Sequence, residues 1–178
     1  MATSGQRRTK TKSKVVAKAR RVRPPSARAE GQRLPLPPKL MPPRAARLYP
    51  RTRLFDLLDR LREDHRVIWV SAPGGAGKTS LATSYLSARK LPVLWYQVDQ
   101  GDGDIASFFY YMGLAAKRAA PRHKTSLSLL TPEYLADVTT FTRNFFRELY
   151  RRLPRNSVIV LDNYQDAPDD SPLHDVLH

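Results

Sequence analysis

The chain has 178 residues, of which 41% are hydrophobic, enough to build the core of one domain of ordinary size. It contains no cysteine, which excludes disulfide bonds and thiolate metal sites and suits a cytoplasmic location. The formal net charge is +15, but residues 1–47 hold 14 of the 31 Lys and Arg against one acid, Glu30. The rest of the chain has 17 basic and 15 acidic residues, so the part expected to fold is almost neutral.

Residues 1–38 combine like charges with five prolines and few large apolar groups, which predicts a disordered basic tail. Two roles stay open for it: a solvated extension, or an arm that binds nucleic acid weakly and without sequence preference. The tail lacks the apolar stretch of a secretory signal, although an organellar transit peptide remains an alternative for a eukaryotic source. No apolar run in the chain approaches 18 residues, so we expect no membrane-spanning helix.

Beyond the tail, residues 39–178 predict helices that alternate with strands. Residues 52–64 have helical apolar spacing behind Thr52, the expected N-cap, and residues 66–72 form a run typical of a buried strand. The further expected elements are a helix over 79–90, a strand over 92–99, a helix over 104–119 capped by Asp104, a helix over 131–153 capped by Thr131, and a strand over 157–162. Such alternation implies parallel pairing and a layered α/β fold.

The helix expected over 131–153 carries an aromatic stripe. Its members are Tyr134, Phe141, Phe145 and Tyr150. Their spacing favours packing in the core over a role in ligand binding.

A glycine-rich segment, SAPGGAGKTS, lies between the first expected strand and the next helix. Backbone N–H groups that converge at a helix N-terminus bind phosphate, Lys78 would reach the β and γ phosphates, and the Thr79 hydroxyl would bind Mg²⁺. The pattern departs from GxxxxGK[ST] only at Ala72, and a glycine-rich turn with an incidental lysine is the alternative. The predicted ATP-binding residues are Ala72, Gly74, Gly75, Ala76, Gly77, Lys78, Thr79 and Ser80.

A phosphate loop of this type needs a second metal anchor at the tip of an apolar strand. The segment VIVLDNYQD supplies Asp162 in that position. Asn163 follows it, and an amide cannot accept a proton from water as a carboxylate does. We therefore expect binding of ATP and Mg²⁺, with weak ATPase activity at most.

Five segments taken in order resemble the ATPase module of the MalT-like transcriptional regulators: KLMPPR, YPRTRLFDLLDRL, VSAPGGAGKTSL, VLWYQVDQGDGDIASFFYYM and VIVLDNYQDAPDDSPLHDVL. These are signal-transduction ATPases of the STAND class, whose DNA-binding domain is often of the LuxR type. The resemblance implies an ATP-dependent on/off switch, self-association in the active state, and DNA binding through a helix-turn-helix that this chain does not contain. It also makes Arg51 and Arg53 candidate nucleotide contacts.

Two departures from the family pattern accompany this resemblance. Gln100 and Asn163 stand where the family commonly has acids, which weakens the expectation of hydrolysis. The family also implies a sheet of about five strands, whereas three are expected here. We therefore expect a P-loop NTPase sheet truncated after the strand that ends at Asp162, as in a fragment, a truncated product or a remnant gene. Such an open sheet predicts marginal stability.

Two other functions remain open at this level. One is a stand-alone P-loop kinase or NTP hydrolase, for which the sequence offers no clear acceptor site or water-orienting acid. The other is a protein that binds nucleic acid non-specifically through its basic tail.

Overall fold

Two runs of β-branched and aromatic residues pair as a parallel sheet. In the computed structural model, β1 (Val93–Gln97) lies beside β2 (Val158–Asp162), with Val93 opposite Val158 and Gln97 opposite Asp162. The strands predicted over 92–99 and 157–162 and their parallel pairing are thus confirmed.

The structure describes residues 1–2, 36–43, 50–123 and 125–177, so the predicted tail falls largely outside the described residues.

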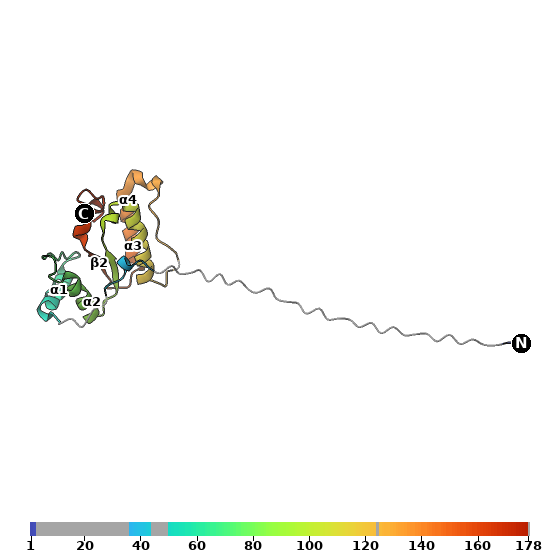
Figure 1. Cartoon of the computed structure of the whole chain (residues 1–178), viewed down its shortest axis with the longest axis horizontal. Helices are drawn as coiled ribbons and strands as arrows, with labels where there is room; N and C mark the ends of the chain where they lie inside the picture. Colours follow the sequence, from blue (N-terminus) through green and yellow to red (C-terminus); the bar gives the residue numbers. More distant parts are fainter. Residues whose placement is uncertain (3–35, 44–49, 124, 178) are drawn as a thin grey trace. The chain divides into compact units, whose positions relative to one another are not determined.

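Side chains of the two strands alternate between two apolar layers. Leu94 and Tyr96 pack with α3 (Ile105–Ala119) and α4 (Val138–Arg152) on one face of the sheet. Trp95 packs on the opposite face with α1 (Thr52–Asp64) and α2 (Lys78–Ala88). Figure 1 shows these two helix pairs on either side of the strands. The observed architecture is therefore a mixed α/β fold in which helices cover both faces of a parallel pair.

Short elements complete the described fold. They are four 3₁₀ turns, η1 (Pro38–Leu40), η2 (Gln100–Gly103), η3 (Pro132–Asp137) and η4 (Tyr164–Asp166), and the helix α5 (Leu173–Leu177). Within the described residues, no helix combines the length and apolar character that crossing a bilayer requires.

The predicted helix caps are right in one case and wrong in two. Asp104 caps α3 as predicted, accepting hydrogen bonds from the backbone N–H groups of Ala106 and Ser107. Thr52 is instead the first residue of α1, and no side chain caps that helix. Thr131 precedes the 3₁₀ turn η3 and makes no capping bond, while Asp137 caps α4 through the N–H of Thr140. Helix α4 begins later than predicted because Pro132 starts a separate 3₁₀ turn. The Asp137 side chain then caps the first turn of the α-helix.

The predicted aromatic stripe is only half buried. Phe141 and Phe145 lie in the core, one helical turn apart, and Leu149 continues their line. Tyr134 and Tyr150 are 48% and 62% exposed, so their placement in the core was wrong. Tyr134 belongs to η3, whose period differs from that of α4, and Tyr150 follows the buried position Leu149 around the helix.

Residues 66–72 do not form the predicted strand. Val67 and Trp69 are 79% and 70% exposed, although their sequence has strong β character. A strand requires a neighbour for its backbone hydrogen bonds, and among the described residues only β1 and β2 pair. The described sheet therefore has two strands where the sequence predicted three.

Candidate functional site

The glycine-rich loop adopts backbone angles that only glycine accepts readily. Gly75 and Gly77 have φ values of +76° and +80°, in the left-handed region, and Gly77 immediately precedes α2. A Cβ at Gly74 or Gly75 would meet no atom within 4 Å, so space lies beside the loop at these positions. Residues 71–76 are exposed, and the first turn of α2 begins at the lysine and threonine of the predicted motif.

Lys78 folds back across this loop. Its Nζ donates to the carbonyl oxygen of Ala72 at 2.7 Å and approaches that of Pro73 at 3.4 Å. Both partners are neutral, so an anion placed at the loop would offer the ammonium a stronger, charge-assisted partner. The lysine therefore lies where a phosphate group could compete for it.

Thr79 and Asp162 meet although 83 residues separate them. The Thr79 hydroxyl donates to the Asp162 carboxylate, with Oγ1 at 2.8 Å from Oδ1 and 3.1 Å from Oδ2. Asp162 ends β2, and its carbonyl oxygen accepts the N–H of Val98, which anchors the strand end. Thus the two residues predicted to bind Mg²⁺ are in direct contact.

The donor chemistry of this pair suits magnesium, which prefers hydroxyl, carboxylate, water and phosphate oxygens. Within the described part of the chain, no group of three or more His, Cys, Asp or Glu side chains could hold a metal by itself. Mg²⁺ at Thr79 and Asp162 would therefore need further oxygens from water or from a phosphate ligand. These two residues remain the predicted metal site.

Of the two candidate arginines, one reaches the loop. Arg51 Nη1 donates to the carbonyl oxygen of Ala76 at 3.2 Å, and a Cβ at Gly77 would lie 3.0 Å from its Nη2. Arg53 is exposed on the first turn of α1 and makes no hydrogen bond to the loop in the described structure. The loop thus collects two cationic groups, from Arg51 and Lys78, while Arg53 stays outside it.

A buried charge cluster, not anticipated from the sequence, lies beyond the end of β1. Lys39 Nζ is 3.0 and 3.1 Å from the two carboxylate oxygens of Asp102, which is fully buried, and 2.8 Å from Asp99. The Tyr96 hydroxyl also donates to Asp102, at 2.5 Å, and burial together with this bond raises the pKa of Tyr96. No sequence signal links Lys39 to an acid 63 residues away. The cluster fixes η1 against the sheet and the turn that follows β1.

Tyr164, two residues after Asp162, belongs to a small aromatic group. Asn163 has φ +57°, and the Tyr164 ring then meets Trp69 edge to face, with centroids 5.2 Å apart. The Tyr164 hydroxyl lies 2.6 Å from Nδ1 of His174, whose Nε2 lies 2.9 Å from the Pro168 carbonyl. Because a carbonyl only accepts, Nε2 carries a proton, and in the neutral imidazole the tyrosine hydroxyl donates to Nδ1. The exposed segment before the loop therefore rests on the turn after β2.

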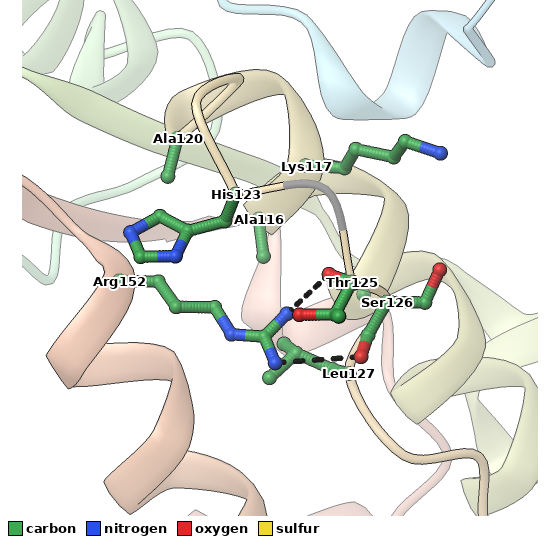
Figure 2. A pocket seen from close by; sticks show the side chains of 9 residues that line it. Ala116, Lys117, Ala120, His123, Thr125, Ser126, Leu127 and Arg152 are labelled. Atoms are coloured by element: carbon green, nitrogen blue, oxygen red, sulfur yellow. Dashed lines mark hydrogen bonds between the residues drawn. The ribbon is translucent and has the colours of Figure 1, made fainter.

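The described cavities lie away from the glycine-rich loop. Figure 2 shows the first, where Arg152 donates to the carbonyls of Thr125 and Ser126 at 2.6 and 3.4 Å. Its space of about 10 Å³ is enough for one water molecule. The second, of about 390 Å³, is lined by residues of η3 and α4 and by Ser128. Neither cavity includes a residue of the predicted nucleotide site, in which residues 71–76 are exposed.

Comparison with known proteins finds distant relatives among transcriptional regulators. The chain is 29% identical over 102 residues to the HTH-type transcriptional regulator MalT of Cronobacter sakazakii, covering 57% of this chain and 11% of that protein. It is 29% identical over 125 residues to the protein of the same name from Vibrio campbellii, covering 67% and 13%. No protein-family model matches the chain, and no solved structure does. The chain thus spans a small part of the length of the curated relatives it matches.

Proposed function

We propose that this chain is a nucleotide-binding module of a MalT-like transcriptional regulator and that it binds Mg-ATP as a switch. The contact between Thr79 and Asp162 carries the proposal, because it joins, from distant parts of the sequence, a hydroxyl and a carboxylate that together could bind the metal of a nucleotide complex. The distant similarity to MalT supports the regulatory context.

In the proposed complex, the loop N–H groups and the N-terminus of α2 hold the phosphates. Lys78 exchanges the Ala72 carbonyl for a phosphate oxygen, and Arg51 approaches from the other side of the loop. Thr79 and Asp162 bind Mg²⁺, which would neutralise phosphate charge. ATP binding is proposed to promote self-association, in keeping with the resemblance to switch ATPases.

The site is better suited to holding ATP than to hydrolysing it. Hydrolysis needs a group that orients and deprotonates water near the terminal phosphate. Asn163 and Gln100 offer amides where family members commonly have acids, and Asn163 lies directly beside Asp162. We therefore propose slow turnover, which a switch requires if the bound state is to persist.

Equilibrium binding of fluorescently labelled ATP tests the proposal. Lys78→Ala should weaken binding about tenfold or more, because a charge-assisted hydrogen bond is removed. Arg60→Ala removes an equal charge from an exposed position on α1 and is the matched control. Equal affinity of wild type and Lys78→Ala would refute the site. Steady-state phosphate release at an enzyme-like rate would instead favour a stand-alone hydrolase.

A further inference from the structure

The folded part is nearly neutral in total, but its charges are separated. Acidic residues concentrate at or after the carboxyl ends of the two strands: Asp99, Asp102, Asp104, Asp162, Asp166, Asp169, Asp170 and Asp175. A separate group of exposed basic residues, with few acids near it in the sequence, lies at the C-terminal ends of α3 and α4 and in the turns beyond them: Lys117, Arg118, Arg122, His123, Arg151 and Arg155. We call this second group the basic edge.

Packing brings the end of α4 beside the connection that follows α3, next to two members of the basic edge, Lys117 and His123. Arg152, at the end of α4, binds the carbonyls of Thr125 and Ser126 in the connection that follows α3. Figure 2 shows Lys117 and His123 beside this junction. Arg155 lies in the turn between α4 and β2, at the amino end of the strand. The basic edge is therefore at the opposite end of β2 from Asp162.

The positive charge of the basic edge is not neutralised locally. Residues 105–131 contain no acid, and residues 138–161 contain only Glu148. Glu148 binds Arg152 at 2.9 Å and lies 3.9 Å from Arg151, so this one acid is shared by two arginines. Among the described residues, Arg122 and Arg155 form no ion pair.

The helix dipole accounts for only part of this pattern. Basic residues in the last turn of a helix are stabilised by the negative end of the helix dipole. This explains why Lys117, Arg118 and Arg151 occur where they do. Arg122 and Arg155 lie beyond the helix ends, where that stabilisation falls away. Mutual repulsion of these exposed cations is relieved by a ligand with several negative charges.

We propose that the basic edge binds the phosphate backbone of double-stranded nucleic acid without sequence preference. Four of its six members are arginines, whose planar guanidinium matches a phosphate in two hydrogen bonds. A duplex presents phosphates at regular, close spacing, so several members can be engaged together. The basic edge includes no residue of the nucleotide loop or of residues 1–38.

The test measures binding of a labelled DNA duplex of mixed sequence to the full chain over a series of salt concentrations. The variant R118Q/R122Q/R155Q removes three charges from the basic edge. The control R60Q/R66Q/R143Q removes three exposed charges elsewhere and leaves the tail unchanged. We expect the slope of log affinity against log salt to become shallower by about 3 in the first variant only.

Two results would overturn the proposal. Equal slopes for the two triple variants would assign duplex binding to the tail or to net charge alone. If R118Q/R122Q/R155Q loses binding to vesicles that contain phosphatidylserine but binds the duplex as wild type does, the basic edge is assigned to membranes. If the triple variant does not fold, as judged by circular dichroism, Arg122→Gln and Arg155→Gln are measured singly, each with an expected change in slope of about 1. Lys78→Ala should leave duplex binding unchanged, which separates this proposal from the nucleotide site.

Discussion

The hydroxyl of Thr79 donates a hydrogen bond to the carboxylate of Asp162 at 2.8 Å, joining the start of α2 to the end of β2. If this pair binds Mg²⁺, Asp162→Asn should weaken ATP binding about tenfold when Mg²⁺ is present and little in EDTA. The amide can still accept the bond from Thr79, but it has lost the charge that attracts the metal. Labelled-ATP titrations in both buffers measure this difference, with Asp166→Asn as a control. An equal loss in both buffers would contradict a metal role.

Lys39 should make a large contribution to the free energy of unfolding. Lys39→Met leaves the fully buried carboxylate of Asp102 without its cation, and breaking a buried pair in this way costs about 3–5 kcal/mol. Urea unfolding gives the value. Adding Asp102→Asn to Lys39→Met should recover part of the loss, because no buried charge is then left uncompensated; Asp99, the other partner of Lys39, is exposed to water. A loss below about 1 kcal/mol would show that the pair behaves as an exposed ion pair.

Asp104 should make the stability of the fold depend on pH. The hydrogen bond from the Ser107 hydroxyl, followed by those from the N–H groups of Ala106 and Ser107, lowers the pKa of Asp104 from its ordinary value of 3.8. Its ionised cap therefore stabilises the fold above pH 3.8, and this contribution is lost as the pH falls through the lowered folded-state pKa. Asp104→Ala should cost about 1 kcal/mol at pH 7, with the difference from wild type shrinking at low pH.

The matched control for this cap is Asp104→Asn, which retains a capping side chain that does not titrate. Unfolding by urea over a pH series distinguishes the three proteins. A constant difference between wild type and Asp104→Ala down to the lowest pH would contradict the titrating cap.

Trp69 should be open to solvent, whereas Trp95 should not. They are the chain's two tryptophans, and their exposed fractions are 70% and 2%. Acrylamide should quench the fluorescence of wild type strongly, and Trp69→Phe should reduce the quenching constant severalfold because only the buried indole remains. Strong quenching that persists in Trp69→Phe would place Trp95 in solvent. Weak quenching of wild type would indicate that residues 66–72 are covered.

Elements whose signals are local could be predicted from the sequence. The helices of α1 and α3 and both strands follow from apolar periodicity, and the Asp104 cap lies next to the helix it begins. The loop that contains Lys78 closely follows a phosphate-binding sequence motif, so its candidate residues could be named in advance. The errors at Thr131 and Tyr134 arose where two turn types compete within a few residues, which apolar spacing does not resolve.

By itself, the sequence determined the two strands that pair, the helices α1 and α3, the glycine-rich loop and the separation of a basic N-terminus from a nearly neutral remainder, because each is set by neighbouring residues. Tertiary structure alone decided which distant groups meet: Thr79 with Asp162, Lys39 with Asp102, and Arg152 of α4 with the carbonyls of Thr125 and Ser126 after α3. It also decided that residues 66–72 are not a strand. A strand depends on a partner for its backbone hydrogen bonds, and β propensity cannot supply one.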